Sequence, residues 1–101
     1  MSMKAYAAGL AATFTLLSAS TALAQTRIEW WHAMTGANNE VVDTLAAEFN
    51  ESQEEYEVVP VFKGTYPETL NAGIAAFRAN QAPHIIQVFD VGTGVMMAAE
   101  G

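Results

Sequence analysis

The fold follows from residues 56–89, which read YEVVPVFKGTYPETLNAGIAAFRANQAPHIIQVF. The stretch opens with 56–62, a run rich in strand formers, although Pro60 weakens its interior. It closes with 84–89, a nearly continuous apolar run of the kind buried on both faces of a parallel sheet. Between the two runs, apolar residues recur at helical spacing at Leu70, Ile74 and Phe77. A strand, a helix and a strand in this order predict a parallel α/β unit with a right-handed crossover.

The start and the end of this central helix are both marked in the sequence. Thr65 and Glu68 have the spacing of a capping box, in which each side chain satisfies a backbone N–H of the first turn. Pro67 between them suits the first turn of a helix, where its missing N–H has no partner to lose. Residues 80–83, which include Pro83, end the helix.

The same alternation of elements continues on both sides. Residues 26–31 alternate and predict a first strand, and apolar residues at helical spacing predict a helix that Asn38 or Asn39 caps: Val41, Val42, Leu45, Ala46 and Phe49. The acidic residues of this helix, including those at 48 and 51, predict a solvated face, together with the acids that follow at 54, 55 and 57. Residues 90–94 predict a turn, and 95–99 the start of another helix. The fold class is therefore α/β, with a β-α-β-α-β parallel sheet.

The N-terminus has the organisation of a secretory signal. Lys4 is followed by the apolar stretch 5–17 and by small residues that end in Ala22-Leu23-Ala24, which predicts cleavage before Gln25. The alternative is an anchor helix, but about 20 apolar residues are needed to span a bilayer and polar residues interrupt this stretch. We expect residues 1–24 to be a signal peptide, with no membrane insertion after cleavage, and residues 25–101 to be the exported part.

Composition excludes several classes of function. The 101 residues carry 4 basic and 11 acidic side chains, a net charge of −7, which argues against nucleic-acid binding. The chain has no Cys, so disulfides, thiolate zinc sites and thiol nucleophiles are excluded. Small exported domains usually need disulfides or a bound metal to be stable. The sequence therefore predicts an N-terminal fragment of a larger protein that is poorly stable alone.

In an open parallel sheet, ligands bind beyond the carboxyl ends of the strands. This rule selects the loops around 31–35, 63–66 and 90–93, in which we single out four candidate ligand-binding residues: Trp31, His32, Tyr66 and Asp90. Each has a structural alternative. Trp31 suits a core, His32 a hydrogen-bonded loop, Tyr66 an exposed helix start and Asp90 an Asx turn.

No catalytic or metal-binding constellation accompanies these residues. The sequence has no Ser nucleophile elbow, and His32 and His84 lack metal-ligand spacing. Gly92 and Gly94 lack the third glycine of a dinucleotide loop. The pattern favours a binding protein without cofactor or metal over an enzyme.

Five segments carry a resemblance to a known family: 31–34, 61–66, 72–78, 82–83 and 87–93. Together they resemble the start of the glycerophosphate-binding branch of the extracellular solute-binding proteins of bacterial ABC importers. The resemblance implies two α/β lobes of the type II periplasmic-binding-protein fold, of which this chain holds the beginning of the first. It also implies a periplasmic location, capture of sn-glycerol-3-phosphate or its diesters, and delivery to a permease of two membrane subunits with two ATP-binding subunits.

The resemblance assigns roles to two of the candidates. Tyr66 matches a family tyrosine that contacts the ligand, and Asp90 stands where the family has a ligand-binding Glu. The shorter Asp leaves open whether it contacts the ligand directly or through water. Two other functions share the sequence features: a sugar-binding relative of the same family, and a secreted glycerophosphodiester hydrolase, which the lack of a nucleophile or metal cluster disfavours.

Overall fold

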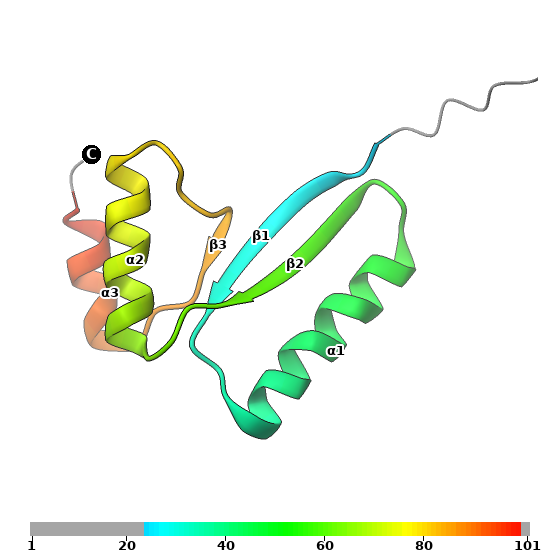
Figure 1. Ribbon diagram of the computed structural model, residues 1–101, viewed down its shortest axis with the longest axis horizontal. Helices are drawn as coiled ribbons and strands as arrows, with labels where there is room; N and C mark the ends of the chain where they lie inside the picture. Colours follow the sequence, from blue (N-terminus) through cyan, green and yellow to red (C-terminus); the bar gives the residue numbers. More distant parts are fainter. Residues whose placement is uncertain (1–23, 100–101) are drawn as a thin grey trace, which may run out of the picture.

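The computed structural model describes residues 24–99, which form three strands and three helices (Figure 1). In chain order the elements are β1 (Thr26–His32), α1 (Gly36–Ser52), β2 (Tyr56–Phe62), α2 (Tyr66–Arg78), β3 (Ile85–Ile86) and α3 (Asp90–Met97). The alternation of strands and helices confirms the predicted α/β class. The predicted signal peptide, residues 1–24, lies outside the described residues except for Ala24.

The strands form a parallel sheet in the order β2-β1-β3. β1 and β2 pair along their whole length, from Thr26 opposite Tyr56 to His32 opposite Phe62. Pro60 does not interrupt β2, because β2 lies at an edge of the described sheet, where a residue without an N–H is tolerated. The third strand joins the other side of β1, so the chain reverses its direction across the sheet after β2.

This reversal places helices on both sides of the sheet. With right-handed crossovers, the helix after β1 and the helix after β2 cover opposite faces. Figure 1 shows α1 along one side, and α2 and α3 side by side on the other. The buried apolar side chains come from both layers and from the middle strand: Trp31, Val42, Ala46 and Leu70.

The third strand is shorter than predicted. Only Ile85 and Ile86 pair with β1, whereas the apolar run predicts a buried strand over 84–89. Ile85 is exposed, so burial on both faces is wrong for this residue. After Ile86 only the N–H of Gln87 still bonds to β1, at 2.9 Å from the Trp31 carbonyl oxygen, and the chain then turns into α3.

The glycine-containing segment 90–94 is helical, so the predicted turn is wrong. α3 begins at Asp90. Gly92 is buried in this helix, and a Cβ added there would lie 3.1 Å from Phe89 Cε1 and 3.6 Å from Leu70 Cδ2. The glycine therefore permits close packing of α3 rather than a change of chain direction.

α1 also begins earlier than predicted. Thr35 is its N-cap residue, and Asn38 and Asn39 lie inside the first turn rather than at the cap. Gly36 has a φ of 55°, a value that a glycine adopts without strain, so the helix can begin directly after Thr35. The Asn39 amide faces the Asp43 carboxylate at 3.5 Å instead.

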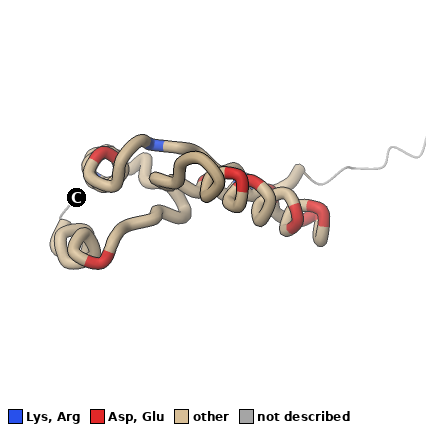
Figure 2. Tube along the Cα trace, turned by 90° about the horizontal axis from the view of Figure 1, so that it is seen from below, with Lys and Arg blue, Asp and Glu red and all other residues tan. Residues whose placement is uncertain are grey.

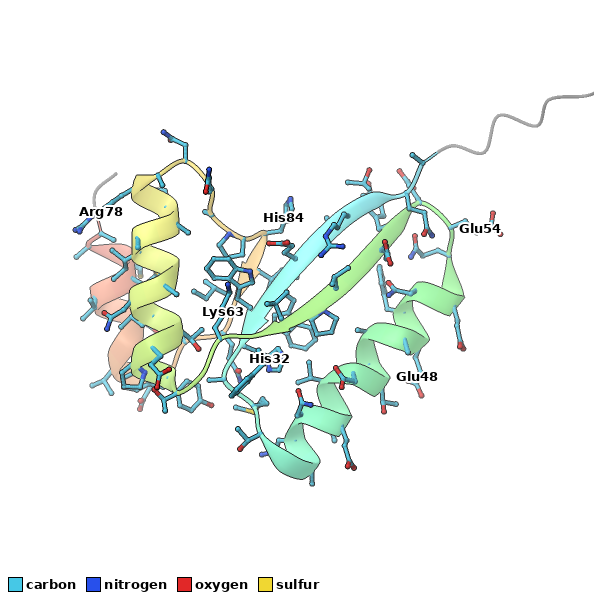
Figure 3. The ribbon with its side chains drawn as sticks, in the orientation of Figure 1. His32, Glu48, Glu54, Lys63, Arg78 and His84 are labelled. Atoms are coloured by element: carbon cyan, nitrogen blue, oxygen red, sulfur yellow. The ribbon has the colours of Figure 1, made fainter. Side chains whose placement is uncertain are left out.

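The acidic residues lie on the solvated face, as predicted. Figure 2 shows them recurring along α1, and in Figure 3 Glu48 and Glu54 point away from the sheet. The acids at 48, 51, 54, 55 and 57 are all exposed. Within residues 24–99, none of the helices has the length and apolar character required to cross a bilayer.

Candidate ligand site

The loops that follow the three strands meet at one edge of the sheet, because parallel strands all end at the same side. These loops are residues 33–35, 63–65 and 87–89. The strand order β2-β1-β3 makes the gap between the ends of β1 and β3 the point at which the chain reverses direction. In doubly wound sheets this crevice is where ligands bind.

Three hydrogen bonds to backbone atoms hold the loops together. The Lys63 N–H donates to the His32 carbonyl oxygen at 2.9 Å, which joins the ends of β1 and β2. The Gln87 N–H donates to the Trp31 carbonyl oxygen at 2.9 Å, which joins the ends of β1 and β3. The Ala33 N–H donates to Gln87 Oε1 at 3.1 Å. The edge is therefore a fixed arrangement of backbone segments.

Tyr66 is positioned by the start of α2. Half of the predicted capping box is present: the Glu68 N–H donates to Thr65 Oγ1 at 3.3 Å, whereas Glu68 Oε1 accepts from the Thr65 hydroxyl at 3.1 Å rather than from a backbone N–H. Gly64 makes the turn into the helix with a φ of 101°, where a side chain would be strained. The aromatic ring of Tyr66 packs against Phe89, with ring centroids 5.6 Å apart. Tyr66 thus links the starts of α2 and α3.

A groove of about 560 Å³ opens beside Tyr66. It is lined by the last residue of β2, by residues that follow β1 and β2, and by the first turn of α2: Ala33, Thr35, Phe62, Gly64, Thr65, Tyr66, Pro67 and Glu68. The groove combines aromatic surface with hydroxyl groups, a lining that suits a small polar ligand.

Asp90 lies beside this region but does not line the groove. It is exposed in the first turn of α3, one residue after Phe89. Its Oδ1 accepts a hydrogen bond from the Val91 N–H at 2.8 Å, which is a bond to the next residue rather than the predicted alternative of an Asx turn. The Tyr66–Phe89 contact brings Asp90 to the same edge of the sheet as Tyr66.

Trp31 is buried on the side of the sheet that α2 covers. Only 9% of its surface is exposed, its indole N–H donates to Glu29 Oε2 at 3.3 Å, and the Lys63 ammonium lies 3.8 Å from the ring centre. Figure 3 shows Lys63 on this side. A buried and paired indole agrees with the structural alternative for Trp31.

His32 faces the opposite side, toward α1 (Figure 3). It is 1% exposed, its ring contacts those of Trp30 and Phe62, and its Nδ1 accepts a hydrogen bond from the Met34 N–H at 3.2 Å. Burial lowers the pKa of His32, and the carboxylate of Asp43 opposes this only in part. The neutral imidazole therefore fixes the loop after β1, as the structural alternative requires.

Two residues of this edge, Gln87 and Phe89, were not singled out from the sequence. Gln87 acts through a contact with Ala33, 54 positions away, and Phe89 through the ring of Tyr66. Only their position at the end of a predicted strand could have indicated them as residues of this edge, because a local motif does not reveal contacts with distant residues.

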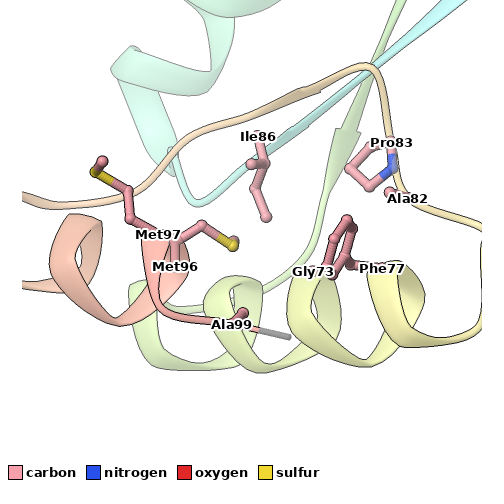
Figure 4. A pocket seen from close by; sticks show the side chains of 8 residues that line it. All are labelled: Gly73, Phe77, Ala82, Pro83, Ile86, Met96, Met97 and Ala99. Carbon is pink, nitrogen blue, oxygen red and sulfur yellow. The ribbon is translucent and has the colours of Figure 1, made fainter. Parts of the chain in front are cut away.

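A second groove, of about 320 Å³, lies between α2 and α3 (Figure 4). All its lining residues are apolar: Gly73, Phe77, Ala82, Pro83, Ile86, Met96, Met97 and Ala99. Such a surface offers no side-chain donor to a charged ligand. In the part of the chain that the structure describes, no group of three His, Asp or Glu side chains could hold a metal ion.

Comparison with known proteins gives close relatives. An sn-glycerol-3-phosphate-binding periplasmic protein UgpB of Agrobacterium fabrum is 68% identical over 96 residues, which are 95% of this chain and 22% of that protein. The UgpB of Rhizobium meliloti is 74% identical over 80 residues, 79% of this chain and 19% of that protein. The UgpB of Yersinia pestis is 50% identical over 86 residues, 85% of this chain and 20% of that protein.

This chain is similar to one part of the UgpB proteins. The similarity confirms the resemblance inferred from the sequence motifs. The chain spans about a fifth of the length of these UgpB relatives. The relatives are named periplasmic, in agreement with the predicted location, and they are named as binding proteins. No protein-family model matches the chain.

Proposed function

We propose that the protein carrying this chain is the periplasmic solute-binding component of an ABC importer for sn-glycerol-3-phosphate and glycerophosphodiesters. The observation that carries the proposal is 68% identity to a named sn-glycerol-3-phosphate-binding protein across 95% of the chain. The strand order supports it, because it creates a ligand crevice at the edge where Tyr66 and Asp90 lie. The complete protein would have two lobes and would be exported by the signal of residues 1–24.

In this proposal each side chain acts through ordinary hydrogen-bonding chemistry. The Tyr66 hydroxyl donates to a ligand oxygen, and its ring, held by Phe89, covers the ligand. The Asp90 carboxylate accepts hydrogen bonds from glycerol hydroxyl groups. An acidic chain can bind an anionic ligand in this way when cationic groups from the rest of the protein face the phosphate. The loaded protein would dock on a permease of two membrane subunits with two ATP-binding subunits.

Isothermal titration of the full-length native protein with sn-glycerol-3-phosphate and glycerophosphocholine tests the proposal. Binding should weaken about 10-fold or more in Tyr66→Phe and Asp90→Asn, since each variant loses a hydrogen bond to the ligand. Melting temperatures should change little, because Asp90 is exposed and Phe keeps the ring contact of Tyr66. Glu48→Gln, at an exposed acid on α1, is the control and should bind like the wild type.

Three results would contradict the proposal or a part of it. A protein that binds a neutral oligosaccharide but neither glycerophosphate ester would be a sugar-binding relative. Release of products from glycerophosphocholine during prolonged incubation would indicate the hydrolase alternative. Unchanged affinity in both variants would show that Tyr66 and Asp90 are not ligand residues.

A further inference from the structure

Gln87 bridges the ends of β1 and β3 with both its backbone and its side chain. Its N–H donates to the Trp31 carbonyl oxygen, at 2.9 Å, and its Oε1 accepts from the Ala33 N–H, at 3.1 Å. Ala33 is the first residue after β1, and Gln87 is the first residue after β3. The carboxamide therefore lies in the crevice at which the sheet reverses direction.

The bond to Ala33 determines which way the carboxamide is turned. A backbone N–H can bond only to an acceptor, so the carboxamide oxygen must face Ala33 and the Nε2 must face away from it. Among the hydrogen bonds of residues 24–99, none is donated by Nε2. The side chain is half-buried, but Nε2 is not among the buried polar atoms without a partner, so this donor is accessible to water and therefore also to a ligand oxygen.

We propose that Gln87 has two roles in the binding site: its Oε1 holds the loop after β1, and its Nε2 donates a hydrogen bond to an oxygen of the bound ligand. The inference rests on the proposed function and names an additional residue of the same site. Gln87 lies on the same connection as Phe89 and Asp90, so the three residues would approach the ligand from the start of α3.

Two substitutions separate these roles. Gln87→Glu keeps an oxygen for the Ala33 N–H but loses the Nε2 donor. Gln87→Met keeps the length of the side chain and loses both groups. Gln81→Glu adds the same charge at an exposed position in the segment before β3 and serves as the control. Titration with sn-glycerol-3-phosphate and thermal unfolding are measured for each full-length protein.

The inference predicts about 10-fold weaker binding for Gln87→Glu, with a melting temperature close to that of the wild type. Gln87→Met should lose affinity to at least the same degree and should also melt at a lower temperature. The loss in Gln87→Glu should persist in about 1 M NaCl, where charges are screened beyond about 3 Å and repulsion by the new carboxylate is weak. Gln81→Glu should bind normally.

Wild-type affinity in Gln87→Glu, or a loss that disappears at high salt, would overturn the ligand contact while the proposed function stands. An unchanged melting temperature in Gln87→Met would overturn the loop-holding role. If the wild-type protein does not bind the ester at all, the proposed function fails and this inference fails with it.

Discussion

At the ligand edge, burial sets the protonation state of one residue, His32. The ring is 1% exposed between the sheet and α1, and its Nδ1 holds the Met34 N–H. The side chain can accept this bond only when Nδ1 is unprotonated. Burial lowers the pKa of His32 and thus favours the form that the loop requires.

This shift predicts a pH dependence of stability. Because the folded-state pKa is lowered, the unfolded chain binds more protons than the folded protein below about pH 6.5. The contribution of His32 to stability is therefore greatest above that pH and falls as the pH decreases toward the folded-state pKa. The side chain in His32→Asn keeps an acceptor for the Met34 N–H but does not titrate. When the pH is lowered, this variant should therefore lose less unfolding free energy than the wild type.

Urea unfolding of both full-length proteins at about pH 7 and about pH 5 measures this difference. All other residues are the same in both proteins, so their contributions cancel in the comparison. Equal losses of unfolding free energy on acidification would show that His32 does not couple folding to pH.

At the scale of elements, glycine determines how closely α2 approaches the sheet. Gly73 is buried in the middle of α2, and a Cβ added there would clash with Ile86 Cδ1 of β3 and lie 3.2 Å from Met96 Cε of α3. One residue without a side chain therefore lets three elements meet. Gly94 in α3 differs, because an added Cβ would have no atom within 4 Å.

The two glycines provide a matched pair of substitutions. Gly94→Ala should stabilise the full-length protein by about 0.5–1 kcal/mol, because Ala has a higher helix propensity than Gly and its Cβ would have no atom within 4 Å to clash with. Gly73→Ala gains the same propensity but must shift the side-chain ends of Ile86 and Met96, so it should be about 0.5–1.5 kcal/mol less stable than Gly94→Ala. Denaturant midpoints measure both values, and equal stability of the two variants would contradict the close packing of α2.

The molecule as a whole leaves much apolar surface uncovered. Along α1, the side chains of Val41, Leu45 and Phe49 are exposed at helical spacing. On α3, Val91 is 72% and Met97 83% exposed. Surfaces of this kind are usually covered by other protein. Since the UgpB relatives are far longer, such coverage by further residues of the same protein agrees with the proposed two-lobed architecture.

This exposure predicts that residues 25–101 alone are poorly stable. The isolated polypeptide should unfold without a cooperative thermal transition and should bind the hydrophobic dye ANS, because its apolar faces remain accessible. Calorimetry and ANS fluorescence of the purified segment measure both properties. A sharp monomeric transition without dye binding would show that the small core of Trp31, Val42, Ala46 and Leu70 suffices.

The class of fold, the order of elements and the start of α2 could all be derived from the sequence alone. Periodicity and capping are local properties, so the Thr65–Glu68 box and the helical spacing of Leu70, Ile74 and Phe77 could be recognised without coordinates. The motifs around Tyr66 and Asp90 also sufficed for the resemblance to glycerophosphate-binding proteins, which the UgpB relatives confirm.

The length of β3, the helical state of 90–94 and the contacts at the ligand edge could not be derived in this way and became known from the three-dimensional arrangement of the chain. Each depends on residues distant in the chain: Ile85 and Ile86 pair only with Trp30 and Trp31 of β1, Gly92 lies close to Leu70, and Gln87 holds Ala33 across 54 positions. The same reason explains why Trp31 and His32 are buried rather than open to the crevice, since α1 and α2 cover the two faces of β1. The local sequence indicates which secondary structure a segment prefers. Its burial and its strand pairing depend on the distant residues that the fold places next to it.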